Sequence, residues 1–335
     1  MQRRRLGRHG LQVTDLCLGT MTFGLQCDEK TSFEILDAAA EAGLTFLDTA
    51  DAYPLGGGLE RVGRTEEIIG RWMAKRGNRD RIILASKCWA PMRRGPNGYG
   101  LSRQHIMDAI EGSLRRLDTD CIDLYQAHAF DPEVPIEESL RAFDDLQRAG
   151  KVRYVGCSNY PAWRLGEALA AAERLGVAGY ASVQPRYNML YREIETELLP
   201  LCRHRGLGVL VYNPLAGGML SGKYRAGEVP REGTRFTLGN AAARYQDRYW
   251  HEVQLQAVER LQQAVTARGA ELVTVAVAWV LAQPGVTSAI IGASRPEQLP
   301  ANLAASDFDL DDELKALCDA LWWSLPRQRV DEGYR

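Results

Sequence analysis

The sequence lacks the features that mark membrane, secreted and metal-binding proteins. No apolar run in its 335 residues approaches the ~20 residues that a membrane-spanning helix needs. The seven cysteines are scattered and never spaced as C-x-x-C, so neither a disulfide framework nor a metal site is predicted. The basic start, MQRRRLGRHG, runs on into a segment that contains Asp15, unlike the apolar core of a signal peptide. We therefore expect a protein of the reducing cytoplasm.

Neither sign of charge is in excess. The chain has 41 Lys and Arg against 43 Asp and Glu, which gives a net charge of −2. A basic excess typical of nucleic-acid binding is missing, and so is the low hydrophobic content of disordered chains, because 45% of the residues are hydrophobic. No linker rich in Pro, Ser or Gly divides the chain. We expect one domain over residues 1–335 that binds small molecules, and neither nucleic acid nor a membrane; the sequence does not indicate an oligomeric state.

The chain also has no G-x-G-x-x-G after its first apolar segment, which argues against a Rossmann fold. Instead, eight short apolar segments alternate with stretches whose apolar residues recur at helical spacing. The expected strands are residues 16–19, 45–49, 82–86, 122–128, 152–158, 181–185, 208–212 and 288–292. Parallel strands need crossover helices, and eight β-α units are the number that closes a barrel. The predicted fold is therefore of the α/β class, a (β/α)8 TIM barrel, rather than a doubly wound open sheet.

Three segments give more specific expectations. Residues 3–16 predict a β-hairpin, with His9 and Gly10 as its turn, that closes the bottom of the barrel. Residues 192–206 predict one helix ending at a glycine. The long loop after strand 7, residues 213–251, exceeds an ordinary β-α connection and predicts either a lid over a site or a disordered excursion.

Polar residues stand where the expected strands end. The stretch FLDTADAY carries Asp48 out of an apolar run and places Tyr53 in the loop that follows. Lys87 ends the third expected strand and His128 the fourth. Alone, each residue would be an ordinary turn cap, loop side chain, surface charge or packed imidazole. The carboxyl ends of the strands converge on one face of a β/α barrel, so together the four predict one site.

Asp, Lys, Tyr and His together suit proton transfer to a carbonyl oxygen. The phenol of tyrosine has an ordinary pKa of ~10 and is a weak acid at neutral pH. A neighbouring ammonium lowers that pKa, a carboxylate keeps the ammonium charged, and a histidine can orient the substrate oxygen. The carbonyl carbon must also receive a hydride, which no side chain can supply and a nicotinamide cofactor can.

Several further motifs occur in a fixed order along the chain. They are LCLGTMTFG (16–24), GCSNY (156–160), VQPRYN (183–188), YNPLAGGMLSGKY (212–224) and IIGASRPEQLPANL (290–303). With FLDTADAY and the lysine and histidine above, they make the chain resemble the aldo-keto reductases over essentially its whole length. The resemblance implies a barrel that binds NADP(H) across its top, and a catalytic tetrad of Asp48, Tyr53, Lys87 and His128.

The resemblance also implies three groups of cofactor contacts. Residues at the nicotinamide end are Thr20, Met21, Gln26, Asp48, Ser158, Asn159, Gln184 and Tyr212, the last stacking on the ring. Residues along the pyrophosphate are Asn213, Pro214, Leu215, Ala216 and Gly218, with Lys223 and Arg235 as cationic contacts. Residues at the adenosine end are Gly292, Ser294, Arg295, Gln298 and Asn302. An arginine at a helix start suits the 2′-phosphate, so NADPH is expected over NADH.

Substrate contacts are less specified by the sequence. The expected ones are Tyr53, His128 and Trp89. Further aromatic residues either face the mouth, which would suit sugars or cyclic and aromatic carbonyls, or pack the long loop: Tyr99, Phe130, Tyr191, Tyr245, Tyr249 and Trp250. Arg93 and Arg94 either favour an anionic substrate or are solvated surface charges.

Within the family, the chain is similar to the potassium-channel β-subunits and their bacterial relatives. Those β-subunits commonly lack a histidine at the position of His128, and many relatives carry an acidic residue near the adenine where this chain has Ala301. We expect NADPH-dependent reduction of an aldehyde or ketone. Two alternatives stay open: NAD(P)+-dependent oxidation of a sugar or secondary alcohol, because the tetrad is reversible, and a cofactor-sensing binding subunit with little turnover.

Overall fold

Eight parallel strands close into a barrel in the structure, a computed structural model that describes residues 1–326. The strands are β3 (Leu16–Gly19), β4 (Phe46–Asp48), β5 (Ile83–Cys88), β6 (Ile122–Ala127), β7 (Val152–Ser158), β8 (Ser182–Gln184), β9 (Gly208–Val211) and β10 (Ser288–Gly292). They pair in chain order, and β10 returns to pair with β3. The predicted (β/α)8 barrel is confirmed, while residues 327–335 of the expected single domain lie outside the described residues.

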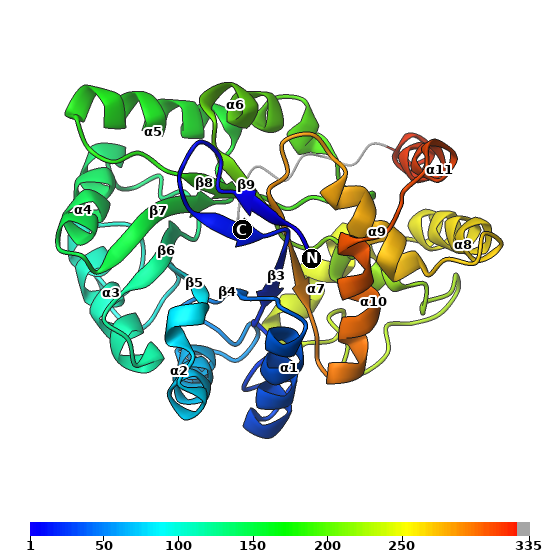
Figure 1. Cartoon of the computed structure of the whole chain (residues 1–335), viewed down its shortest axis with the longest axis horizontal. Helices are drawn as coiled ribbons and strands as arrows, with labels where there is room; N and C mark the ends of the chain where they lie inside the picture. Colours follow the sequence, from blue (N-terminus) through cyan, green and yellow to red (C-terminus); the bar gives the residue numbers. More distant parts are fainter. Residues whose placement is uncertain (327–335) are drawn as a thin grey trace.

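Helices surround the barrel (Figure 1). They are α1 (Glu29–Glu41), α2 (Arg64–Arg76), α3 (Arg103–Leu117), α4 (Ile136–Arg148), α5 (Ala162–Leu175), α6 (Leu198–Arg205), α7 (Ala242–Tyr249), α8 (Glu252–Thr266), α9 (Leu272–Leu281), α10 (Leu299–Leu303) and α11 (Asp312–Trp323). Ser102 caps α3 by accepting a hydrogen bond from the backbone N–H of His105. No helix in the described part of the chain is long and apolar enough to cross a membrane.

The prediction of one helix over residues 192–206 was wrong. The segment forms a short 3-10 turn, Glu193–Glu195, and then the separate helix α6. Pro200 lies in the first turn of α6, where its missing N–H has no partner to lose. Farther into a helix, its ring would clash with the carbonyl of Thr196, so the α-helix begins only at Leu198.

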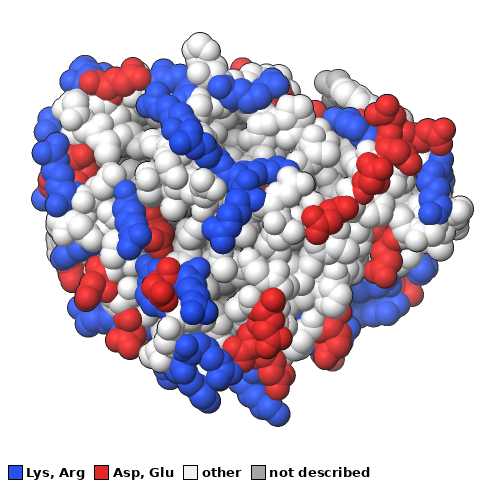
Figure 2. All heavy atoms as spheres, in the orientation of Figure 1, with Lys and Arg blue, Asp and Glu red and all other residues white. Residues whose placement is uncertain are grey.

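The N-terminal hairpin closes the bottom of the barrel, as predicted. Strands β1 (Arg3–Arg5) and β2 (Gln12–Thr14) pair antiparallel and lie in front of the barrel in Figure 1. The predicted turn at His9 and Gly10 was wrong, because residues 6–11 all lie between the two strands. Leu6 instead turns into the barrel, and Gly7 packs so tightly on Gly206 that any Cβ would clash. Lys and Arg side chains gather over this face (Figure 2).

The barrel interior changes from apolar to polar along the strands. Its lower layer consists of Cys17, Phe46, Ala85, Leu124, Ala181, Leu210 and Ile290, sealed by Leu6 and Val13 of the hairpin. Successive inward residues of a strand are two positions apart. The next inward residues on four of these strands are Asp48, Lys87, Gln126 and Tyr212. The two-residue spacing of inward side chains therefore places these polar residues at the upper, carboxyl end of the barrel.

Residues 213–251 after β9 are folded, and they are not a disordered excursion. They contain a 3-10 segment, Ala216–Ser221, and the helix α7. Three of their aromatic rings, Tyr224, Phe236 and Trp250, pack edge to face with centroids 4.8–5.3 Å apart. The segment reaches across to the loops after β3 and β4: Gln26 Nε2 donates to the carbonyl of Gly233 at 3.1 Å, and Gly239 packs against Gly56.

Candidate active site

A buried ion pair lies at the centre of the polar layer. The Lys87 ammonium donates to Asp48 Oδ2 at 2.5 Å and to the carbonyl of Thr49 at 2.8 Å. Lys87 is fully buried and Asp48 is 3% exposed. A buried charge is tolerated only when it is paired and hydrogen-bonded, and these contacts supply both. Asp48, at the end of the second strand, and Lys87, on the third, are therefore in direct contact.

Two glutamines complete the shell around Asp48. Gln184 Nε2 donates to Asp48 Oδ1 at 2.8 Å, and Gln126 Nε2 donates to the same oxygen at 3.3 Å. Gln126 was missed in the sequence. It stands two residues before His128 on the same expected strand, and strand alternation was the signal that could have placed it on the inner face.

Tyr53 and His128 lie over this pair. The Lys87 Nζ is 5.2 Å from the centroid of the Tyr53 ring, and the Tyr53 and His128 rings meet edge to face with centroids 5.8 Å apart. Burial, with a further contribution from Lys87, lowers the pKa of His128 well below its usual 6.5. The imidazole is therefore neutral at neutral pH and can offer one N–H to a substrate oxygen. The structure brings all four predicted side chains together.

The expected nicotinamide contacts surround the same space. Asn159 Nδ2 donates to the carbonyl of His128 at 2.9 Å, and the Tyr212 hydroxyl donates to Asn159 Oδ1 at 2.8 Å. The Ser158 hydroxyl donates to the carbonyl of Gln184 at 2.8 Å. Asn159 has a φ of 58°, a left-handed conformation that asparagine tolerates well. This conformation turns the chain at the end of β7 and keeps these amide groups at the mouth.

Two other expected contacts at this end face elsewhere in the structure. The Thr20 hydroxyl, which is fully buried, donates to the carbonyl of Asp48 at 2.9 Å. Gln26 faces the long segment after β9 through its bond to Gly233. Met21 accepts a hydrogen bond at its carbonyl from Leu55 N–H, which ties the loop after β3 to the loop that carries Tyr53.

The segment after Tyr212 suits a pyrophosphate. Asn213, Ala216, Gly217 and Gly218 all have positive φ, between 50° and 100°. Turns that contain left-handed residues can form concavities in which backbone N–H groups bind anions. A Cβ built on Gly218 would meet nothing closer than 3.8 Å, so the backbone there is open to a ligand.

Cations gather beyond this turn. Burial lowers the pKa of Lys223, and the nearby Arg295 and Arg231 lower it further. Cations placed close enough to oppose one another's charge are typical of a site that an anion occupies. Arg235 lies over the ring of Tyr245, 5.5 Å from its centroid. These residues fit a phosphate-bearing cofactor.

The adenosine-end residues form a compact turn after β10. The Gln298 side chain accepts from the Ser294 N–H at 2.8 Å, and Asn302 Nδ2 donates to the carbonyl of Gln298 at 2.7 Å. Arg295 precedes a 3-10 turn, Pro296–Gln298, which leads directly into the five-residue helix α10. Gly292 is exposed at the end of β10 and leaves the mouth open.

Several of the aromatic residues that could have faced the mouth pack within the long segment after β9 instead. Tyr245 and Tyr249 are buried within the long segment after β9, and Trp250 packs there too, so these three do not form an open mouth. Tyr99 is 58% exposed. Trp89 follows β5 with a φ of 155°, which an L-residue rarely adopts, and its carbonyl accepts from Gly100 N–H at 2.7 Å. Strained residues of this kind concentrate at functional sites.

The two arginines of the loop after Trp89 do not point to an anion site. Arg93 donates to the carbonyls of Pro96 and Asn97 in its own loop. Arg94 is exposed. Their alternative reading, solvated or structural charge, fits these contacts.

A second acidic residue of FLDTADAY is buried behind the tetrad. Asp51 is fully buried, and its oxygens make no hydrogen bond of good geometry within the described part of the chain. Burial, and secondarily the Glu66 carboxylate, raises the pKa of Asp51 well above its usual range. Glu66 is itself satisfied by the Ser86 hydroxyl at 2.5 Å and by Arg116 at 2.7 Å. Asp51 therefore holds its proton more tightly in the folded protein than in the unfolded chain.

Asp51→Asn is expected to raise the melting temperature by a few degrees at pH 7. Because the folded state binds the Asp51 proton more tightly than the unfolded state, stability is lost as pH rises above the ordinary aspartate range of ~4. The gain from asparagine should therefore vanish near pH 4. Thermal unfolding of both proteins between pH 4 and 8 measures this, and a gain that is independent of pH would show that Asp51 is ionised.

The barrel, the buried Lys87–Asp48 pair beside Tyr53 and the nearby cations agree with an oxidoreductase of the nicotinamide-dependent class. The chain belongs to the Aldo/keto reductase family, whose sequence profile matches residues 15–322. It is therefore an NAD(P)H-dependent oxidoreductase that acts on small carbonyl compounds.

Named relatives agree with this assignment. A Bacillus subtilis (strain 168) protein named as the oxidoreductase YrpG is 42% identical over 94% of each chain. The probable voltage-gated potassium channel subunit beta of Oryza sativa subsp. japonica is 36% identical over 100% of each chain. The aldo-keto reductase YhdN of Bacillus subtilis (strain 168) is 35% identical over 93% of this chain and 91% of its own. The predicted similarity to the potassium-channel β-subunits and their bacterial relatives is confirmed.

Proposed function

We propose that the protein reduces an aldehyde or ketone with NADPH and that Tyr53 is the general acid. The observation that carries this proposal is the fully buried Lys87, held by Asp48 at 2.5 Å with its ammonium 5.2 Å from the Tyr53 ring. A structural ion pair needs no phenol beside it, whereas an acid that works near neutral pH needs a cation there.

The four side chains have separate roles in the proposed reaction. Asp48 keeps the Lys87 ammonium charged and in place, through a contact that water does not screen. The ammonium lowers the proton affinity of the phenol, so Tyr53 donates its proton as negative charge develops on the carbonyl oxygen. His128, neutral in its buried position, donates a hydrogen bond to the same oxygen and orients it. The nicotinamide, when bound, supplies the hydride.

The remaining polar groups would hold and orient the cofactor. Ser158, Asn159 and Gln184 suit the carboxamide because each presents a hydroxyl or amide at the mouth. Tyr212 suits stacking against the nicotinamide ring. Lys223 and Arg295 suit the phosphates, and we assign the 2′-phosphate to Arg295 because a guanidinium can bind it through two parallel hydrogen bonds.

Arg295→Ala is expected to weaken NADPH binding by about 10- to 100-fold and NADH binding by less than about 3-fold, because only NADPH carries the 2′-phosphate and a charged hydrogen bond contributes ~1.5–3 kcal/mol. Fluorescence titration with each cofactor measures both constants. Arg8→Ala, an exposed arginine on the hairpin at the other end of the barrel, is the control. Equal losses for NADPH and NADH would remove Arg295 from 2′-phosphate recognition.

The reaction itself is tested by loss of reduced-nicotinamide absorbance with a panel of aldehydes and ketones, each with NADPH and with NADH. Turnover that prefers NADPH supports the proposal. Tight NADPH binding without turnover of any carbonyl would favour a cofactor-binding role instead.

We also infer a reducing, cytoplasmic setting, supported by seven free cysteines, six of them buried.

A further inference from the structure

Arg186 stands one layer above the Asp48–Lys87 pair. It follows Gln184 by two residues, and Gln184 points inward to Asp48. The β8–β9 ladder continues past both strands as a bridge between Arg186 and Tyr212, a residue that packs on the barrel interior. Paired residues of neighbouring parallel strands point to the same face. Arg186 therefore projects into the barrel mouth, over the layer that holds the proposed acid.

This arginine is a buried cation with no carboxylate. It is 8% exposed, and no Asp or Glu side chain of residues 1–326 lies within ion-pair distance of it. Its guanidinium carbon is 3.6 Å from the centroid of the Tyr191 ring. Burial acts to lower the pKa of Arg186, but the oxygens of Tyr249, Tyr212 and Tyr191 raise it on balance, so the charge persists. Aromatic faces stabilise a cation by only ~1–2 kcal/mol, less than its desolvation costs.

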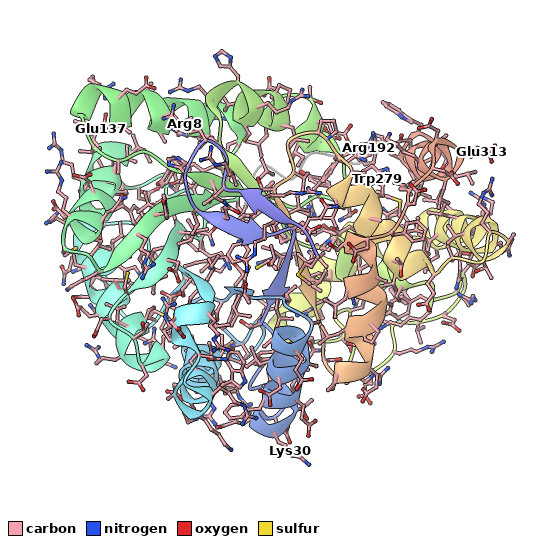
Figure 3. All side chains as sticks on the ribbon, viewed as in Figure 1. Arg8, Lys30, Glu137, Arg192, Trp279 and Glu313 are labelled. Carbon is pink, nitrogen blue, oxygen red and sulfur yellow. The ribbon has the colours of Figure 1, made fainter. Side chains whose placement is uncertain are left out.

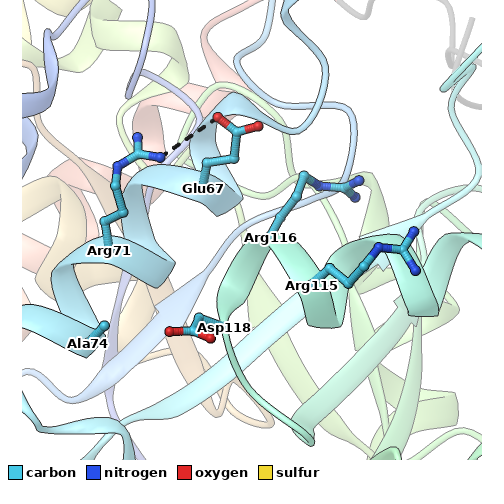
Figure 4. Close-up of a pocket in the computed structure, with 6 residues that line it drawn as sticks. All are labelled: Glu67, Arg71, Ala74, Arg115, Arg116 and Asp118. Atoms are coloured by element: carbon cyan, nitrogen blue, oxygen red, sulfur yellow. Dashed lines mark ion pairs between the residues drawn. The ribbon is translucent and has the colours of Figure 1, made fainter.

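A second arginine that lies against an aromatic ring is neutralised. Arg192, which lies by Trp279 in Figure 3, resembles Arg186 in burial and ring contact but pairs with Glu195 at 2.8 Å and Asp319 at 2.7 Å. In the surface hollow between α2 and α3, Arg71 pairs with Glu67 (Figure 4). Arg116, at the same hollow, pairs with the buried Glu66. Arg186, by contrast, has no carboxylate partner within residues 1–326.

We propose that Arg186 binds an anionic group of the substrate, a carboxylate, so that the enzyme reduces carbonyl compounds that also carry an acid. The inference rests on the proposed function in placing the reacting carbonyl at Tyr53. A guanidinium binds a carboxylate through two parallel hydrogen bonds, and the Tyr191 ring packs against the guanidinium of Arg186. A cofactor phosphate is the other anion available to this mouth, but Lys223 and Arg295 already provide cations for it.

Direct binding tests the site without turnover. Benzoate is titrated calorimetrically into the NADPH complex of the wild type and of Arg186→Gln. We expect benzoate to bind the wild type and to bind Arg186→Gln at least 10-fold more weakly. Arg8→Gln, a change of the same charge on the exposed hairpin, should bind benzoate like the wild type. No binding by the wild type, or equal binding by Arg186→Gln, would overturn the proposal.

Turnover identifies the source of the anion. The substrates are the ortho, meta and para carboxybenzaldehydes and their methyl esters, which differ in charge and offer three separations between acid and carbonyl. For at least one acid, Arg186→Gln should lower kcat/KM at least 10-fold and change the matched ester less than about 3-fold. If Arg186→Gln instead binds NADPH more weakly, and kcat/KM falls equally for acids and esters, Arg186 contacts a cofactor phosphate. That result would overturn the proposal.

Folding and the proposed function are separated by two further readouts. Because an unpaired buried charge is removed, Arg186→Gln should melt no lower than the wild type, whereas Arg192→Gln should melt lower since it removes the ion pairs with Glu195 and Asp319. Arg186→Lys keeps the charge and should bind benzoate with an affinity between those of the wild type and Arg186→Gln. It replaces Arg186→Gln in the test if the glutamine variant does not fold. Benzoate binding without reduction of any aldehyde would refute carbonyl reduction while leaving the Arg186 site intact.

Discussion

Tyr53→Phe is expected to lower carbonyl reduction by about 10²- to 10⁴-fold, the range that general acid catalysis contributes. The substitution removes only the hydroxyl. The ring remains to pack against His128, 5.8 Å away, and over the Lys87 ammonium. The loss should fall on kcat, because the proton is needed as charge develops on the oxygen and not for binding.

The NADPH dissociation constant separates this role from a structural one. We expect it to change less than about 3-fold in Tyr53→Phe, because the groups assigned to the carboxamide and the phosphates are all kept in the variant. Steady-state rates and fluorescence titration on the same preparations give both numbers. Turnover near the wild-type rate would show that another group, or water, delivers the proton.

The fold could be predicted from the sequence because its signals are local. Each barrel strand is a short run of β-branched, aliphatic or aromatic residues, and eight of them alternate with helical patterns. The errors came where a local pattern met a tertiary constraint. Residues 192–206 are periodic enough for one helix, but Pro200 delays its start. The hairpin turn is longer than His9 and Gly10 because Leu6 is drawn into the barrel floor.

The site could be predicted in part, for a related physical reason. Asp48, Lys87 and His128 end apolar runs, so they stand out in the sequence. Gln126 and Arg186 belong to the same inward face, but neither ends its apolar run, and Arg186 follows β8 only as a single bridge. That Arg186 has no counter-ion is a property of packing among distant tyrosines, and no spacing in the sequence encodes it.

Lys87→Met is expected to remove activity and stability together. Activity should fall by about 10²- to 10⁴-fold, because the phenol loses the cation that makes it acidic. The free energy of unfolding should fall by about 3–5 kcal/mol, since Asp48 keeps only its two glutamine donors and becomes an uncompensated buried charge. Urea unfolding and steady-state kinetics measure the two effects.

The double variant Asp48→Asn with Lys87→Met distinguishes the two losses. Removing both charges eliminates the buried unpaired ion, so most of the lost stability should return. Activity should not return, because the Tyr53 phenol still has no ammonium beside it. A double variant that regains both stability and turnover would mean that the ion pair only supports the barrel. If only stability returns, the protein buries the Lys87 charge, at a cost in stability, because Tyr53 needs the ammonium for its chemistry.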